Sequence, residues 1–129
     1  MESVEGPSST SVRSLSGPAI RTFERIADRW KLTLAERERI LGLPRTTYFR
    51  VRKRPERAAF SGDTLERISH VFGIYKALHV LFPEDQRADT WIDRPSRRLG
   101  GLTARMRLTS GQFSDLVDLR RYLDASRGW

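Results

Sequence analysis

Basic residues are concentrated between residues 45 and 57. Six of them stand there against one acid: Arg45, Arg50, Arg52, Lys53, Arg54 and Arg57 against Glu56. Guanidinium and ammonium groups on a helix bind DNA phosphates and base edges in the major groove. A solvated basic helix surface is the alternative interpretation. The turn that directly precedes these residues favours DNA binding.

A helix-turn-helix motif is predicted for residues 34–55. A short charged helix reaches Gly42, whose freedom to adopt a positive φ suits a helix end, and Pro44 suits the opening of the next helix. Thr33 and Glu36 have the spacing of a capping box, so the first helix should start there. The second helix of such a motif enters the major groove of DNA. We call this second helix the reading helix.

Each side chain of the reading helix has an expected role. Those expected near base edges or phosphates at the helix start are Arg45, Thr46, Thr47 and Arg50. Those expected on phosphates are Arg52, Lys53 and Arg54. Tyr48 either reaches a phosphate or packs its ring with the hydroxyl exposed. Phe49 and Val51 are expected in the core.

The overall charge favours the same class of partner. The chain has 129 residues, with 24 Lys and Arg against 16 Asp and Glu, a net charge of +8 and a pI of about 10.9. This balance favours a polyanion. No apolar run approaches the roughly 20 residues of a membrane-spanning helix, and the N-terminus lacks the order of a signal peptide, so we expect a cytoplasmic protein. The absence of cysteine excludes disulfides, thiolate catalysis and Cys-ligated zinc.

Three regions are expected along the chain. They are a mobile tail at residues 1–16, a helix-turn-helix DNA-binding region at 17–82 and a C-terminal domain at 83–129. A helix opening is expected at residues 16–18, and apolar residues then recur at helical spacing: Ile20, Phe23, Ile26, Ala27 and Trp30. Ser61 is expected to cap a long helix. No strand pattern is found, so the predicted fold is all-α.

Catalytic and cofactor chemistry is not expected. His70 and His79 are the two histidines, and their spacing matches no metal-binding motif. Gly100-Gly101 lacks the strand and the spacing of a phosphate-binding loop, so it is expected to form a turn. No nucleophile with a base, and no carboxylate pair, appears in a pocket-like context. The chain is therefore predicted to be no enzyme and to hold no cofactor or metal.

The C-terminal part carries a further pattern. Trp91 closes an acidic helix, and Pro95-Ser96, Gly100-Gly101 and Tyr122-Leu123-Asp124-Ala125 follow. With the helix-turn-helix before it, this pattern resembles the Xre/MbcA/ParS antitoxin family over residues 18–129. The chain departs from the family at Ser96, where Asn is usual, and at Arg37-Glu38, where the first helix of the motif usually has a Leu-Ala pair. The second departure predicts either a rotated helix or a looser helix contact.

The resemblance implies a function and a second binding region. It implies a type II antitoxin that binds and neutralises a RES-domain toxin, which consumes NAD, and that represses its own operon as a homodimer on double-stranded DNA. In the family the C-terminal region obstructs the NAD pocket of the toxin. The residues expected to bind the toxin are Gly100, Gly101, Arg120, Arg121, Tyr122, Arg127 and Trp129.

Alternatives stay open for this second region and for the function. Tyr122, Arg127 and Trp129 could instead form a frayed tail, although burial of a Trp side chain stabilises by about 1.5–3 kcal/mol or more. A stand-alone helix-turn-helix transcriptional regulator, without a toxin partner, is the second function. A basic RNA-binding or structural module that uses charge alone is the third.

Overall fold

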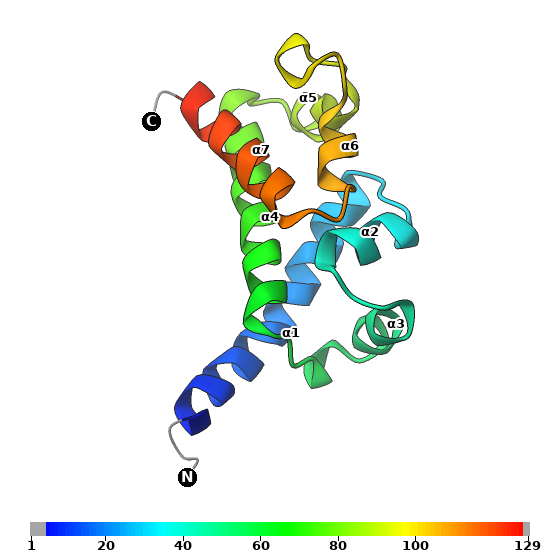
Figure 1. Ribbon diagram of the computed structural model, residues 1–129, viewed down its shortest axis with the longest axis vertical. Helices are drawn as coiled ribbons and strands as arrows, with labels where there is room; N and C mark the ends of the chain where they lie inside the picture. The colour runs from blue at the N-terminus through cyan, green and yellow to red at the C-terminus, as the bar shows by residue number, and fades with distance from the viewer. Residues whose placement is uncertain (1–4, 128–129) are drawn as a thin grey trace.

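The computed structural model describes residues 5–127, with side chains described from Leu15 onward. The α-helices, in chain order, are α1 Glu5–Arg29, α2 Leu34–Leu41, α3 Arg45–Lys53, α4 Gly62–Leu81, α5 Asp85–Thr90, α6 Ala104–Leu108 and α7 Phe113–Ser126 (Figure 1). Short 3₁₀ helices occupy Pro55–Arg57, Trp91–Asp93 and Arg97–Leu99. No strand occurs among the described residues, and the predicted all-α fold is confirmed.

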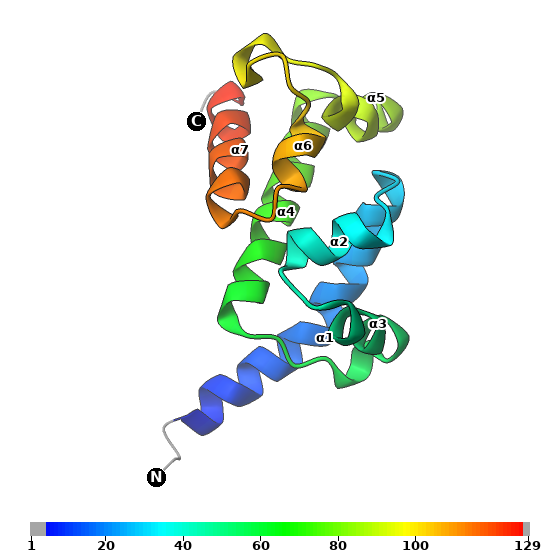
Figure 2. The same ribbon diagram turned by 45° about the vertical axis from the view of Figure 1, so that its right-hand side comes forward.

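Helix α4 belongs to both halves of the molecule. It packs against α1 and α2 and also against α5 and α7. Helices α1–α3 lie toward one end of the molecule and α5–α7 toward the other, as Figures 1 and 2 show. We call α1–α3 the N-terminal half and α5–α7 the C-terminal half. None of the helices within residues 5–127 combines the length and apolarity that crossing a bilayer requires.

One hydrophobic core runs through both halves. The apolar face predicted for α1 is buried, with Phe23 fully inaccessible and Trp30 1% exposed. Buried residues of α4 and α7 join the same cluster: Ile68, Val71, Ile74, Ala77, Leu78, Leu116, Leu119 and Leu123. Each large apolar side chain buried in this way stabilises the fold by about 1.5–3 kcal/mol. The continuous core holds the two halves in one arrangement.

The start of α1 differs from the prediction. A helix opening was expected at residues 16–18 after a mobile tail, but α1 already begins at Glu5, and residues 1–4 lie outside the described part. Ser16 is buried, and its hydroxyl accepts a hydrogen bond of 2.9 Å from the Phe60 main-chain N–H. A Cβ at Gly17 would lie 3.2 Å from the carbonyl oxygen of Pro55. Ser16 and Gly17 therefore leave room for the segment before α4 to pack against α1, and they do not mark the start of the helix.

The local signals predicted at other helix ends are confirmed. Thr33 Oγ1 accepts a hydrogen bond from the Glu36 main-chain N–H at 3.1 Å, and the Thr33 N–H donates to Glu36 Oε1 at 2.9 Å. This is the predicted capping box. Gly42 ends α2 with φ of 68°, in the left-handed region that glycine adopts without strain. Ser61 caps α4 by accepting from the Thr64 N–H at 3.3 Å.

Arg105 of α6 joins the C-terminal half to the helix-turn-helix. Its guanidinium donates to Asp93 at 2.6 Å, to Glu36 at 2.8 Å and to the carbonyl oxygen of Trp30 at 2.6 Å. Glu36 is the capping residue of α2, and Trp30 follows the last turn of α1. Charge-assisted hydrogen bonds such as these are the strong ones in proteins. Arg105 therefore fixes α6 against the end of α1 and the start of α2.

Two further arginines cross between the halves. Arg39 Nε donates to the carbonyl oxygen of Thr109 at 3.0 Å. Arg67 of α4 donates to the carbonyl oxygens of Ile40 and Gly111, each at 3.3 Å. These bonds satisfy main-chain oxygens at the end of α2 and in the loop between α6 and α7. The helix-turn-helix is thus tied to the C-terminal half at both ends of α2.

Candidate nucleic-acid interface

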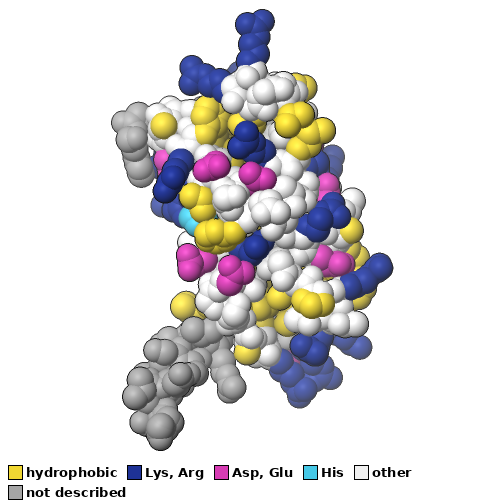
Figure 3. Space-filling view, viewed as in Figure 1, with side chains coloured by type: hydrophobic (Ala, Val, Ile, Leu, Met, Phe, Trp, Pro, Cys, Tyr) yellow, Lys and Arg dark blue, Asp and Glu magenta, His cyan; other side chains and the backbone are white. Residues whose placement is uncertain are grey.

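Helix α3 packs one side inward and presents the other to solvent. Tyr48 is fully buried and Val51 is 6% exposed. The exposed side chains along the opposite side, which we call the outer face of α3, are Arg45, Thr46, Phe49, Arg50 and Lys53. Figure 3 shows Lys and Arg side chains gathered at the lower right, where α3 lies in Figure 1. The outer face is therefore cationic and accessible.

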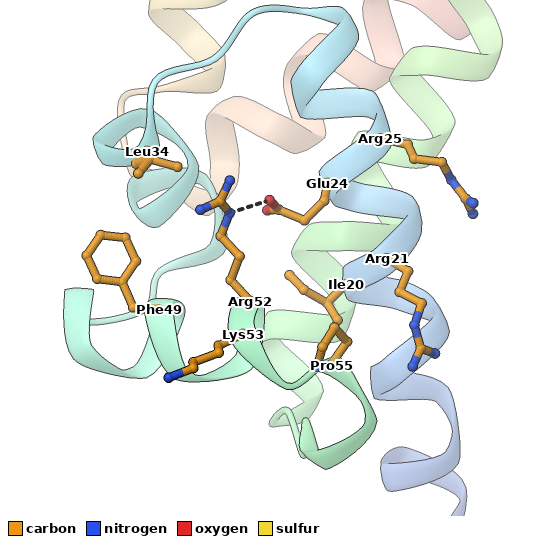
Figure 4. A pocket seen from close by; sticks show the side chains of 9 residues that line it. All are labelled: Ile20, Arg21, Glu24, Arg25, Leu34, Phe49, Arg52, Lys53 and Pro55. Carbon is orange, nitrogen blue, oxygen red and sulfur yellow. Dashed lines mark hydrogen bonds and ion pairs between the residues drawn. The ribbon is translucent and has the colours of Figure 1, made fainter.

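A cluster of charged residues around the buried Arg37 and Tyr48 sets the position of α3. Glu24 of α1 accepts hydrogen bonds from Tyr48 Oη at 2.5 Å, from Arg37 Nη1 at 2.9 Å and from Arg52 Nε at 3.1 Å. Arg37 Nη2 also donates to Asp28 at 2.8 Å. One carboxylate thereby connects all three helices of the N-terminal half. The dashed line in Figure 4 marks the pair of Glu24 and Arg52.

The environment of this cluster shifts two pKa values. Burial raises the pKa of Tyr48 well above its usual range, and the hydrogen bond to Glu24 raises it further. Burial alone lowers the pKa of Arg37, but the hydrogen bond to Asp28 and the charge of Glu24 outweigh it and raise the pKa. Tyr48 therefore stays a neutral donor and Arg37 stays charged at neutral pH. Arg37 does not loosen the contact between α2 and its neighbours, because its guanidinium bonds α2 to α1.

The structure corrects two expectations for aromatic residues. Tyr48 was expected to contact a phosphate or to expose its hydroxyl, but the residue is fully buried and the hydroxyl binds Glu24. Phe49 was expected in the core, but it is 37% exposed on the outer face. The guanidinium carbon of Arg45 lies 5.4 Å from the centre of the Phe49 ring. Phe49 is thus a candidate contact residue that the sequence interpretation missed.

The other residues expected at DNA fall into two groups. Arg45 keeps 74% of its side chain exposed although its Nε lies 4.0 Å from Glu38, and no acidic side chain of residues 15–127 pairs with Arg50 or Lys53. Thr46 and Arg54 are exposed, and Thr47 is half-buried. Arg52 differs, because its Nε pairs with Glu24 and its side chain is 47% exposed. The main role of Arg52 is therefore to hold α3 against α1, because Glu24 neutralises part of the charge that Arg52 could offer to a ligand.

A groove beside α3 extends the basic surface onto α1. It has a volume of about 820 Å³ and is lined by Ile20, Arg21, Glu24, Arg25, Leu34, Phe49, Arg52, Lys53 and Pro55. Figure 4 shows Leu34 and Phe49 on one side of it and Arg21 and Arg25 on α1 at the other. Both arginines are exposed. Arg21 and Arg25 stand four residues apart on the side of α1 away from the core. This spacing could have indicated from the sequence that the basic surface extends onto α1, but the sequence interpretation missed it.

The glycine pair expected to form a turn does so. Gly100 and Gly101 have φ of 70° and 80°, where a Cβ would be strained. The loop is closed through the main chain of Ser96, whose N–H donates to the Leu102 carbonyl at 3.1 Å and whose carbonyl accepts from the Gly101 N–H at 2.8 Å. The hydrogen bonds that close this loop need no Asn side chain at position 96. Both glycines are exposed.

The predicted partner-binding residues of α7 are not equally accessible. Arg121 is exposed and Tyr122 is half-buried against the core. Arg120 lies across α4, where it donates to His70 Nδ1 at 3.3 Å, and Gly73 leaves room for its guanidinium. Arg127 keeps 8% of its side chain exposed and lies 3.6 Å from Asp124. Trp129 lies outside the described residues.

Exposed apolar side chains lie in and beside the loop of residues 96–102, which contains Gly100 and Gly101 and which we call the glycine loop. Leu102 is 47% exposed and Met106, one turn along on α6, is 56% exposed, while Leu108 is buried. In Figures 1 and 2 the loop before α6 and the end of α7 both lie at the end of the molecule that is away from α3. Sizeable exposed apolar patches mark protein interfaces, and Leu102 and Met106 could form part of one. No group of three or more His, Asp or Glu within residues 5–127 is arranged to hold a metal ion.

Comparison with known proteins gives the family. The antitoxin Xre-like helix-turn-helix domain matches residues 13–73, and the antitoxin Xre/MbcA/ParS C-terminal toxin-binding domain matches residues 77–128. The chain belongs to the Xre/MbcA/ParS antitoxin family. The outer face of α3 lies within the part matched by the Xre-like helix-turn-helix domain. The glycine loop lies within the part matched by the Xre/MbcA/ParS toxin-binding domain.

A relative matches this chain over almost its whole length. The uncharacterized protein y4oB of Sinorhizobium fredii (strain NBRC 101917 / NGR234) is 39% identical over 128 residues, which cover 98% of each chain. The likeness thus includes both the helix-turn-helix and the toxin-binding domain of the Xre/MbcA/ParS family. No solved structure matches the chain significantly.

Proposed function

We propose that the chain is the antitoxin of a type II toxin-antitoxin pair, that it neutralises a RES-domain toxin which consumes NAD, and that it represses its own operon as a homodimer. The observation that carries this proposal is the separation of two accessible surfaces. A cationic helix face lies in the helix-turn-helix, and an apolar loop region lies in the toxin-binding domain. One chain therefore offers separate surfaces to DNA and to a protein.

The outer face of α3 supports DNA binding. Arg45, Arg50 and Lys53 are exposed on a helix that Tyr48 and Val51 anchor, so phosphates and bases can reach their charges. Two copies of α3 in successive major grooves would lie about 34 Å apart. Gel-shift titrations against the chain's own promoter and against shuffled duplexes test this. Preference for a palindromic promoter site is expected, and equal affinity for all duplexes would leave only a charge-driven module.

The C-terminal half supports binding of the toxin. Leu102 and Met106 offer apolar area, and Arg121 offers charge at the surface of α7. The test is coexpression with the product of the neighbouring gene. Copurification, relief of growth inhibition and recovery of cellular NAD are expected together. A chain that binds its promoter but neither binds nor neutralises that product would be a stand-alone transcriptional regulator.

A further inference from the structure

The exposed aromatic ring on α3 has a position that calls for a specific ligand contact. Phe49 lies on the outer face with Thr46, Arg50 and Lys53, and it also lines the groove together with Leu34. Its 37% exposure contrasts with the fully buried Tyr48 directly before it. An apolar ring in the middle of a cationic face contributes nothing to phosphate binding. Its exposed part suits contact with an apolar group or with a stacked base.

Arg45 limits which part of the ring is available. Its guanidinium lies 5.4 Å from the ring centre, within the range of a cation–π contact, and its Nε lies 4.0 Å from Glu38. The Tyr48 ring lies nearby, with its centre 5.9 Å from that of Phe49. An extruded base would have to displace Arg45 to stack on the ring face that Arg45 covers, while 37% of Phe49 remains exposed. This limited exposed area suits a small apolar group on the wall of a groove.

The major groove of duplex DNA displays one apolar group of this kind. It is the C5-methyl group of thymine, and aromatic side chains are among those that contact it. We propose that Phe49 determines part of the DNA specificity of this chain by packing against a thymine methyl group in the major groove. This inference rests on the proposed DNA-binding function. Phe49 thereby discriminates a base pair, while Lys53 binds the DNA backbone without discrimination.

The test uses the full chain and duplexes selected by it from a random pool. Each thymine of the selected site is replaced in turn by deoxyuridine, which removes only the methyl group. Wild type should lose affinity on the order of fourfold at one thymine per half-site, because burial of one methyl-sized group contributes about 0.8 kcal/mol. Phe49→Ala and Phe49→Asn should bind the thymine and deoxyuridine duplexes equally. Lys53→Ala should bind more weakly overall and keep the fourfold ratio.

The possible failures are separable. Selection of no preferred sequence would overturn the sequence-reading function and the inference together. A preferred sequence in which every thymine tolerates deoxyuridine in wild type would overturn the role of Phe49 alone, whatever the variants do. The same holds if both Phe49 variants keep the fourfold ratio, since another residue would then contact the methyl group. Thermal unfolding of each variant checks that α3 remains folded.

Discussion

Glu36 of α2 and Arg105 of α6 lie 69 positions apart in the sequence and meet at 2.8 Å. The Glu36 oxygen that accepts this bond, Oε1, also accepts the capping hydrogen bond from the Thr33 N–H. Hydrogen bonding to Asp93 raises the pKa of Arg105, so the guanidinium stays charged. The start of the helix-turn-helix is therefore shared with a helix of the toxin-binding domain.

Arg105→Ala should destabilise the whole chain. The change removes hydrogen bonds to Glu36, Asp93 and the Trp30 carbonyl. One buried bond to a charged group contributes roughly 1.5–3 kcal/mol, but water replaces part of this loss because the Asp93 side chain is 50% exposed. We expect the free energy of unfolding in urea to fall by about 2 kcal/mol. Arg98→Ala is the control, because Arg98 is exposed, and it should change stability by less than about 0.5 kcal/mol. Equal effects of the two changes would contradict the role given to Arg105.

Glu24→Gln should impair both folding and DNA binding. The buried Arg37 would keep Asp28 as its remaining acidic partner, so the lost charge of Glu24 should cost about 1–3 kcal/mol. Urea unfolding measures this loss, and gel shifts on the promoter measure the displacement of α3. Glu84→Gln is the matched control, since Glu84 is exposed before α5 in the C-terminal half, away from α3. Unchanged DNA binding by folded Glu24→Gln would show that the cluster does not position α3.

Tyr48 should make the chain sensitive to alkali. Burial, followed by the hydrogen bond to Glu24, raises the pKa of Tyr48 in the folded state, while an unfolded tyrosine titrates near 10. Above about pH 10 the unfolded state loses its proton first, so the stability present at lower pH declines as pH rises. The free energy of unfolding measured from pH 8 to 11 should fall more steeply for wild type than for Tyr48→Phe. Parallel curves would argue against a buried hydroxyl.

His70 should make the contact of α4 and α7 sensitive to acid. Burial and the charge of Arg120 lower the pKa of His70 below its usual 6.5. Above that value the stability from this site is complete, and it declines as pH falls because the unfolded state takes up the proton first. A Cβ in Gly73→Ala would displace the Arg120 guanidinium. NMR titration should therefore give a higher His70 pKa in Gly73→Ala than in wild type, and an unchanged pKa would contradict the contact.

Met106→Asp should release the toxin and leave DNA binding intact. Met106 is 56% exposed on α6, so a charge there costs little in the free chain but opposes an apolar partner surface. Loss of about 2 kcal/mol or more of binding energy is expected if Met106 lies at the centre of the interface. Leu15→Asp, also on an exposed apolar side chain, is the matched control in the N-terminal half. Point variants are preferable to truncation after Arg121, because Leu123 is part of the core.

Structural features that depend on residues close together in the sequence could be predicted. The capping box of Thr33 and Glu36, the positive φ of Gly42 and the Ser61 cap depend on contacts within a few positions, and each was confirmed. The buried side of α1 was predicted from apolar residues at helical spacing over several turns, and a pattern of this length is little affected by a single residue that departs from it. These features gave the all-α class and the place of the helix-turn-helix.

Features that depend on a second helix were missed. Arg37 is buried because Glu24 and Asp28 of α1 pair with it, and nothing near Arg37 in the sequence indicates this. Tyr48 and Phe49 are adjacent aromatic residues on a short helix, so which one faces inward depends on the partner that α1 offers to the tyrosine hydroxyl. A helix opening was expected at the small residues Ser16 and Gly17 because the sequence does not show that residues 55–60 pack against them.

The two family matches meet between residues 73 and 77, inside α4, which runs uninterrupted over Gly62–Leu81. A chimaera of the two matched regions taken from different family members would therefore have to be joined within this helix, in helical phase, and with Gly73 and Arg120 from the same parent.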